Sequence, residues 1–358
     1  MFNIEMNYKY CIRINKAPLL KLLYMVIVFA IVVKPLYGNN ESMEIKNSNA
    51  FFSTKIKDLN FNKKSIDNEY KKYLDFYNLY NESLVMYYGI FNSTGFSNFG
   101  QIFVPENYKS IVIIIHGYLD HSGNLKNLIN KLTKKKFAVA VFDLPGHGLS
   151  SGKRADIGNF TQYVSVLDDF CSIIKENFKG DINFIGHSTG CSVIFDYLHH
   201  NRYETSRFGK VVFVSPLVRS YMYKLSKVGV FISKIFISNI SRNFSKGPSG
   251  DPDYCRFIEL EDPLQARKIP LGWLNAMFNW NKRVKSFTKI DKSVLIFQGE
   301  SDTVVDYEYN INFFKEKVSK VDVVYFKKGK HHLLNETSDI KEKIISEIST
   351  YLDLKKGI

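Results

Sequence analysis

Six strongly apolar runs recur along the chain from residue 110 onward. They lie at 110–118, 137–143, 182–188, 210–216, 293–301 and 321–329, and spans of helical pattern separate the first four. Continuously apolar runs are typical of strands covered on both faces, and the helical spans fit right-handed crossovers of a parallel sheet. The pattern predicts an α/β fold with a mostly parallel central sheet flanked by helices.

Two shorter β-like runs, 85–91 and 101–104, precede these strands and enclose the turn-rich segment NSTGFSNFG. This spacing predicts an antiparallel hairpin at an edge of the sheet. Residues 39–80 are polar and rich in Asn and Lys, and we expect a linker there with one helix around 66–80. The core then comprises a first part, 81–216, and a second part, 291–358.

The interval 217–290 interrupts this alternation because it is too long for one crossover. It holds an amphipathic stretch at 221–240, a turn-rich region and the segment DPLQARKIPLGWLNAMFNW. A loop of this length is expected to carry structure of its own, and we predict an inserted helical lid. Its apolar side either lines an acyl pocket, with its lysines drawn to an anionic lipid surface, or packs on the domain; the pattern leaves both open.

The N-terminal residues 1–38 have the order of a targeting segment. Basic residues come first, the apolar run 22–33 follows, and the polar stretch GNNES begins at Gly38. A run of twelve apolar residues is shorter than the roughly 20 that a spanning helix needs. We therefore expect export, with cleavage near Gly38 favoured over an uncleaved anchor.

Composition and residue spacing argue against a nucleic-acid-binding protein and against a zinc protein. The formal net charge of +14 comes from scattered lysines, and no nucleic-acid-binding signature accompanies it. The four cysteines show no C-x-x-C spacing, and neither His199–His200 nor His331–His332 has the spacing of a helix-borne zinc site. We predict no nucleic-acid partner, no cofactor and no metal.

Ser188 is the candidate nucleophile. It is the central residue of GHSTG at 186–190, a G-x-S-x-G pattern preceded by apolar INFIG and followed by the helix-compatible CSVIFDYLHH. A nucleophile elbow requires this order of strand, sharp turn and helix. The second match, at 148–152, places Ser150 between polar segments, which is typical of a loop.

A serine hydroxyl needs a base to take its proton and an acid to orient that base. In this fold the partners follow in the order Asp then His, each after a strand. Asp302 follows the run 293–301, and His331 and His332 follow 321–329. Spacing alone leaves the choice between the two histidines open.

Two backbone N–H groups must stabilise the oxyanion that forms when serine attacks a carbonyl. We assign one to Thr189, directly after the nucleophile, and the other to Tyr118, in the loop after the strand at 110–118. His116, at the end of the same strand, is interpreted as a residue that structures this loop.

Five motifs together resemble the α/β-hydrolase superfamily, and within it the group of monoacylglycerol lipases, lysophospholipases and S33 serine aminopeptidases. They are HGY (116–118), DLPGHGLSSG (143–152), GHSTG (186–190), GESDTVVD (299–306) and HHLLNE (331–336). The catalytic histidine of that group is commonly followed by Leu after two residues and Glu after five. His331 meets this pattern with Leu333 and Glu336, and His332 remains the fallback base.

The resemblance implies an enzyme that hydrolyses carboxylic esters through an acyl-enzyme, with Ser188, His331 and Asp302 as its triad. The implied substrate is a small single-chain lipid ester such as a monoacylglycerol or a lysophospholipid.

Two alternatives remain. A serine aminopeptidase of the same fold would need an acidic group in the lid to hold the substrate's amine, such as Glu259, Glu261 or Asp262. A non-catalytic binding module would retain the fold without the reaction.

Overall fold

The computed structural model describes residues 56–62, 66–201, 208–221, 223, 226, 237–244 and 247–354. The expected targeting segment, 1–38, and most of the amphipathic stretch at 221–240 lie outside these residues. Within the described ranges, none of the helices combines the length and the apolar character needed to cross a membrane.

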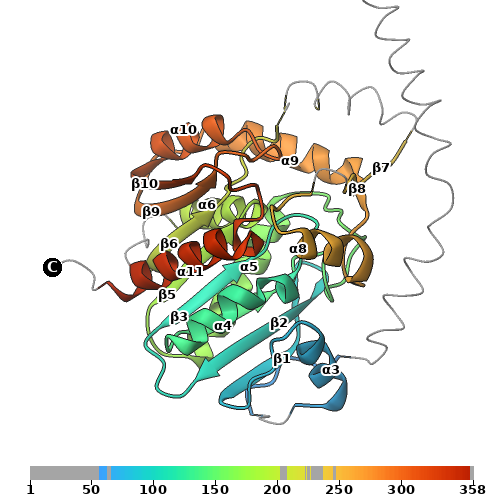
Figure 1. Cartoon of the computed structure of the whole chain (residues 1–358), viewed down its shortest axis with the longest axis vertical. Coiled ribbons are helices and arrows are strands. Elements are labelled where there is room, and N and C mark those ends of the chain that lie inside the picture. Colours follow the sequence, from blue (N-terminus) through green and yellow to red (C-terminus); the bar gives the residue numbers. More distant parts are fainter. Residues whose placement is uncertain are drawn as a thin grey trace, which may run out of the picture. The chain divides into compact units, whose positions relative to one another are not determined.

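Eight strands form one mixed sheet in the order β1-β2-β4-β3-β5-β6-β9-β10 (Figure 1). The hairpin of β1 and β2 is antiparallel and stands at one edge, as predicted, and β2 also pairs antiparallel with β4. All other neighbours are parallel. The strands are β1 (Leu84–Ser93), β2 (Phe96–Pro105), β3 (Ile111–Ile115), β4 (Ala138–Phe142), β5 (Ile182–His187), β6 (Phe208–Val214), β9 (Ile290–Gly299) and β10 (Val318–Phe326).

Helices cover both faces of this sheet, which explains why its central strands are apolar without alternation. In β3, Ile111, Ile113 and Ile115 join the core on one face, and Val112 and Ile114 join the core on the other. The first face carries α5 (Thr161–Asn177), α6 (Thr189–His200), α9 (Leu271–Val284) and α10 (Tyr307–Lys317). The second carries α3 (Asn68–Phe76), α4 (Lys126–Lys134) and α11 (Ser338–Asp353). The mostly parallel, helix-flanked sheet predicted from the sequence is confirmed.

Two boundaries differ from the pattern-based expectation. β2 begins at Phe96 rather than at 101 because the reversal takes only Thr94 and Gly95, both at positive φ, and Phe96 already pairs with Ser93 of β1. The helix expected at 66–80 is α3, and it begins after Asp67, whose carboxylate accepts the N–H of Tyr70 (2.9 Å). The buried side chains of α3 pack into the core beneath the sheet, so this helix is part of the folded unit.

The excursion between β6 and β9, at 217–290, contains more than helices. Its described part includes α8 (Pro252–Arg256), the single turn η4 (Phe257–Glu261), α9 and a small two-stranded sheet of β7 (Asn239–Ser241) and β8 (Lys268–Pro270). The indole of Trp280 on α9 donates to Asp196 on α6 (2.8 Å). This bond fixes the excursion to the core.

Candidate active site

Ser188 lies in a sharp turn between β5 and α6. Its φ of 51° and ψ of −112° are unusual for a residue with a side chain. The flanking glycines permit the turn, because a Cβ at Gly186 would lie 2.6 Å from the backbone N of Cys191, and one at Gly190 would lie 2.2 Å from the carbonyl O of Ile115. The backbone geometry is that of a nucleophile elbow.

The structure brings Ser188, His331 and Asp302 into one chain of hydrogen bonds. His331 Nε2 lies 2.9 Å from Ser188 Oγ, and His331 Nδ1 lies 2.8 Å from Asp302 Oδ2. The three residues follow β5, β9 and β10, whose carboxyl ends share one edge of the sheet because these strands are parallel. Each is no more than 5% exposed.

Asp302 determines where the protons lie in this chain of hydrogen bonds. Its Oδ1 accepts the N–H groups of Val304 (2.8 Å) and Val305 (3.2 Å), and its Oδ2 accepts from Gln298 (3.2 Å). Burial alone would raise the pKa of Asp302, but the adjacent His331 and these backbone donors outweigh it and lower the pKa below its usual value. A carboxylate only accepts, so His331 Nδ1 carries a proton and Nε2 is left to accept from the serine hydroxyl.

The two proposed oxyanion donors lie beside the nucleophile. Thr189 is the first residue of α6, where helical N–H groups have no intrahelical partner, and Tyr118 lines the same cavity as Ser188. Among the described residues, neither N–H donates to another protein atom. His116 holds the loop that carries Tyr118, because its Nδ1 donates to the carbonyl of Gly117 (2.8 Å) and its Nε2 accepts from Leu144 N (2.9 Å).

His332, the fallback base, makes no hydrogen bond to Ser188 among the described residues. Its Nδ1 pairs with the hydroxyl of Tyr254 (2.9 Å), and its backbone N donates to the carbonyl of Pro248 (2.9 Å). Burial, with smaller contributions from His187, His331 and Arg242, lowers its pKa well below 6.5. The geometry therefore places His331, and not His332, in position to act on the serine.

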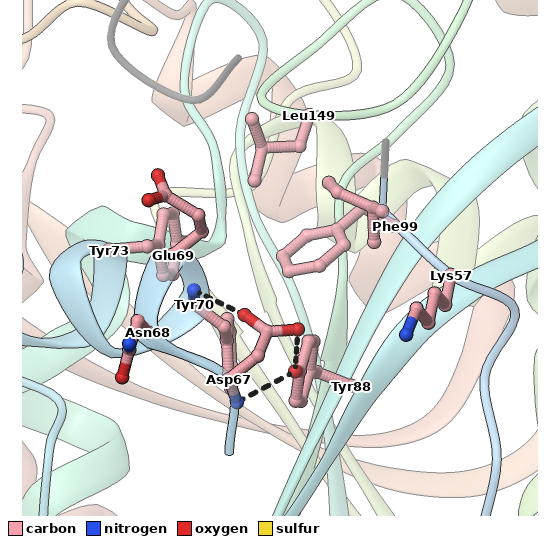
Figure 2. A pocket seen from close by; sticks show the side chains of 10 residues that line it. Lys57, Asp67, Asn68, Glu69, Tyr70, Tyr73, Tyr88, Phe99 and Leu149 are labelled. Carbon is pink, nitrogen blue, oxygen red and sulfur yellow. Dashed lines mark hydrogen bonds between the residues drawn. The ribbon is translucent and has the colours of Figure 1, made fainter. Parts of the chain in front are cut away.

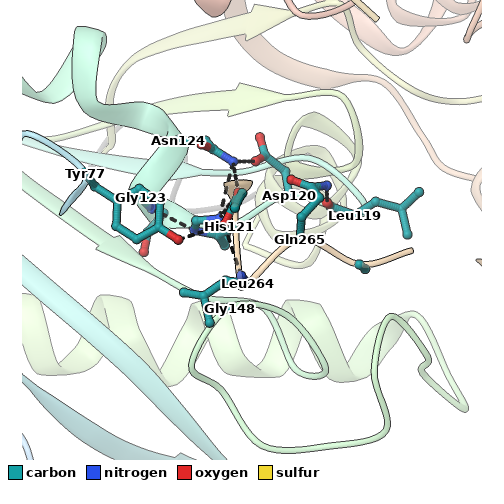
Figure 3. A network of polar contacts seen from close by, with 12 residues as sticks. Tyr77, Leu119, Asp120, His121, Gly123, Asn124, Gly148, Leu264 and Gln265 are labelled. Carbon is teal, nitrogen blue, oxygen red and sulfur yellow. Dashed lines mark hydrogen bonds and ion pairs between the residues drawn. The ribbon is translucent and has the colours of Figure 1, made fainter. Parts of the chain in front are cut away.

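Sequence reasoning missed a buried polar network beside the site, drawn in Figure 3. His121 Nε2 lies 2.8 Å from Asp262 Oδ2, and Tyr77 and Asn124 donate to the same carboxylate at 2.8 and 3.1 Å. His121 and Asp262 are fully buried and stand 141 residues apart in the chain, so no local spacing signals their contact. The network therefore links Asp262, which follows η4, to His121 in the loop after β3.

A cavity of about 390 Å³ opens beside Ser188. Its wall is mostly apolar, and it also includes the cationic side chains of Arg242 and Lys330. The apolar lining consists of Leu119, Leu217, Phe244, Pro248, Ile269, Trp273, Leu274 and Val304, with Tyr118 beside them. The acidic residues that an aminopeptidase would need, Glu259, Glu261 and Asp262, are absent from this lining, and Asp262 is committed to His121.

A second hollow of about 260 Å³ lies between α3 and β1 (Figure 2). In it the hydroxyl of Tyr88 donates to Asp67 (2.5 Å), and the ring of Tyr88 stacks on that of Tyr70 with centroids 3.5 Å apart. No member of the Ser188 site lines it.

Residues 106–338 match the family model Hydrolase_4, described as serine aminopeptidase, S33. The monoglyceride lipase homolog of monkeypox virus is 26% identical over 257 residues, covering 69% of this chain and 91% of the relative. Human monoglyceride lipase is 23% identical over 256 residues, covering 68% and 82%. Phospholipase YtpA of Bacillus subtilis is 24% identical over 214 residues, covering 57% and 80%.

Solved structures share the fold. A soluble variant of monoglyceride lipase from Saccharomyces cerevisiae, in complex with a substrate analog, has a TM-score of 0.64 at 18% identity and covers 74% of this chain and 94% of its own. The monoacylglycerol lipase of Paleococcus ferrophilus has a TM-score of 0.57 at 25% identity and covers 68% and 93%. The chain therefore belongs to the Hydrolase_4 family of α/β hydrolases, and it is a hydrolase of the lipase/esterase type.

Proposed function

We propose that the protein is a serine carboxylic-ester hydrolase that acts on a single-chain lipid ester, such as a monoacylglycerol or a lysophospholipid. One observation carries the proposal: the unbroken hydrogen-bond chain from Asp302 through His331 to Ser188, which ends at the wall of a mostly apolar cavity.

In the acylation step, Ser188 Oγ attacks the ester carbonyl while His331 Nε2 takes its proton. The N–H groups of Thr189 and Tyr118 receive the oxyanion, each worth about 3 kcal/mol of barrier. Asp302 stabilises the imidazolium that forms. His331 then returns the proton to the leaving alcohol, and the acyl group remains on Ser188.

Deacylation repeats the sequence with water. His331 takes a proton from water as the water attacks the acyl carbonyl, and it then gives the proton to Ser188 as the fatty acid departs. The same three residues thus act twice in one turnover.

The volume and the mostly apolar lining of the cavity support a lipid acyl chain as the group that it holds. The volume of about 390 Å³ is at the lower end of the roughly 300–1,000 Å³ typical of small-ligand pockets. One chain fits this size better than several do. The relatives from monkeypox virus and human are named as monoglyceride lipases and the one from Bacillus subtilis as a phospholipase, which supports a lipid ester as the substrate.

Lipid substrates lie in membranes, and we include in the proposal export through residues 1–38 and contact with a lipid surface through the excursion at 217–290. Fractionating the producing cells and sequencing the N-terminus of the recovered protein tests the export. Protein outside the cytosol that starts near residue 39 supports export with cleavage, and protein found only in the cytosol with an intact N-terminus contradicts it.

The decisive experiment measures free fatty acid released from monoacylglycerols and lysophospholipids of several chain lengths by the wild type and by Ser188→Ala. A fluorophosphonate probe should label the wild type and not the variant. Equal turnover by both proteins would overturn the proposal. Faster hydrolysis of amino-acid arylamides, measured by the arylamine released, than of esters would favour the aminopeptidase instead.

A further inference from the structure

Three chemically active side chains outside the triad meet beside it. Asp120 comes from the loop after β3, His187 immediately precedes the nucleophile, and His332 immediately follows the base. Each offers a ligand atom that lies within 4.8 Å of those of the other two. Asp120 is 3% exposed, His187 2% and His332 7%, so the cluster is sheltered from bulk water.

The hydrogen bonds around the cluster leave donor atoms available. His187 Nε2 lies 3.2 Å from the carbonyl O of His331, and because a carbonyl only accepts, this nitrogen carries the proton and Nδ1 presents a lone pair. His332 Nδ1 pairs with the hydroxyl of Tyr254, and in the tautomer in which Nδ1 donates to that hydroxyl, Nε2 keeps a lone pair. Asp120 accepts from Asn124 with Oδ1 (2.8 Å), which leaves Oδ2.

A metal binds imidazole in its neutral form, and the burial of both rings favours that form. The carboxylate supplies the one negative charge of the cluster.

We propose that Asp120, His187 and His332 bind a divalent transition-metal ion, with Zn²⁺ as the best fit, and that its binding inhibits the hydrolase. Two imidazoles and one carboxylate are a ligand set that suits Zn²⁺, with a fourth position left for water. Mg²⁺ and Ca²⁺ prefer oxygen ligands only, so the two nitrogens select against them. Ligand atoms about 2.0–2.2 Å from a tetrahedral metal lie about 3.5 Å from one another, so metal binding requires the three atoms to close in from within 4.8 Å.

Inhibition follows from the position of the cluster and rests on the proposed function. The ring of His331 lies 5.1 Å from that of His187 and 5.7 Å from that of His332, centroid to centroid. His331 must become positively charged when it takes the serine proton. A doubly charged ion this close disfavours the imidazolium, so attack by Ser188 slows.

This inference departs from the sequence-based expectation of no metal. That expectation rested on the adjacent pairs His199–His200 and His331–His332, whereas the cluster draws one residue from each of three separate segments. Only the fold brings them together.

The test uses the full chain and Co²⁺ as a spectroscopic substitute for Zn²⁺. Wild type and Ser188→Ala should each bind one Co²⁺, with visible absorption bands of a low-coordinate site that Zn²⁺ abolishes. His332→Gln, which keeps a partner for Tyr254, and Asp120→Asn should each weaken Zn²⁺ binding in calorimetry by at least about tenfold. His200→Ala removes an exposed histidine and serves as the matched control, with wild-type affinity expected.

A second readout is the rate of fluorophosphonate labelling of Ser188. Saturating Zn²⁺ should slow labelling of the wild type by about tenfold or more, and should leave His332→Gln at its own metal-free rate. Absence of the Co²⁺ bands, or equal Zn²⁺ affinity in the wild type and His332→Gln, would overturn the site. Zn²⁺ binding without slower labelling would overturn the inhibition. Because Ser188→Ala cannot hydrolyse esters, Co²⁺ binding to it tests the site independently of the proposed function.

Discussion

At the scale of single residues, the reactivity of Ser188 depends on groups that never touch a substrate. Asp302 fixes which nitrogen of His331 carries the proton, and the N–H groups of Val304 and Val305 hold the carboxylate in place. The flanking glycines determine whether the turn around the serine can form at all.

Asp302→Asn should lower kcat by about 10³- to 10⁴-fold, because an amide can donate to His331 and then favours the tautomer whose Nε2 cannot accept a proton. Ester hydrolysis by the purified variant measures this effect. Its thermal midpoint, taken in parallel, shows whether the fold is intact. A folded variant that retains more than a tenth of wild-type kcat would contradict the assigned role.

Gly190→Ala should destabilise the protein by about 2–3 kcal/mol, since the new Cβ would collide with the carbonyl of Ile115. Urea unfolding gives the free energy. Gly95→Ala is the matched control: that glycine has a φ of +80° but no atom within 4 Å of the added carbon. Its substitution should cost only about 1 kcal/mol of backbone strain. Equal losses in both variants would show that crowding at the elbow is unimportant.

At the scale of elements, the excursion is fastened to the core by the polar network around Asp262 as well as by apolar packing. Burial alone would lower the pKa of His121 and raise that of Asp262. Their mutual attraction outweighs burial, so the pKa of His121 is raised from 6.5 and that of Asp262 is lowered from 3.8. The pair is therefore charged between about pH 4 and 6.5.

Asp262→Asn should lower the free energy of unfolding by about 3 kcal/mol at pH 6, because it leaves His121 buried without its counter-charge. Equilibrium urea unfolding measures the loss. Asp253→Asn, at an exposed position on α8, is the control and should change stability by less than about 0.5 kcal/mol.

The loss should also depend on pH. Asp262 has a lowered pKa in the folded state, so its contribution is present above about 3.8 and disappears as the pH falls through the folded value. His121 has a raised pKa, so its contribution is complete below about 6.5 and disappears as the pH rises through the folded value. The difference between wild type and Asp262→Asn should be largest between about pH 4 and 6.5 and smaller at pH 9. A difference that grows steadily toward pH 9 would contradict the ion pair.

At the scale of the whole molecule, the cavity is shared between the sheet and the excursion. Tyr118, in the loop after β3, stacks on Trp273 of α9 with ring centroids 3.5 Å apart, and both residues line the cavity. Under the proposed function, the length of acyl chain that the cavity accepts is set where these two parts meet.

Trp273→Ala should therefore enlarge the cavity and shift selectivity toward longer acyl chains, by about tenfold in the ratio of kcat/KM for long over short esters. A series of p-nitrophenyl esters measures the ratio. Trp280→Phe, in the same helix but outside the cavity lining, controls for general loosening of α9 and should leave the ratio unchanged. A ratio that moves toward short chains would refute the role of Trp273.

Much of this organisation could be predicted from the sequence. The central strands are visible because burial on both faces makes them continuously apolar, and the serine, aspartate and histidine of the site stand directly after such strands. The start of β2 was not predicted, because Ser97 and Asn98 stand among polar residues and glycines that look like a turn, whereas the structure pairs both with β1. No local spacing in the sequence indicates that His121 contacts Asp262. The same holds for the proximity of Asp120 to His187 and His332, which only the fold brings together.

β6 and β9 pair directly with each other in the sheet, although more than seventy residues of chain run between them. The strand that delivers Asp302 is thus aligned by its neighbour and not by the segment that precedes it. The length of that segment can therefore change without changing the register in which β9 pairs with β6. Because residues of this one contiguous segment, 217–290, line the cavity beside Ser188, sequence changes within it can alter the cavity while the strand order stays the same.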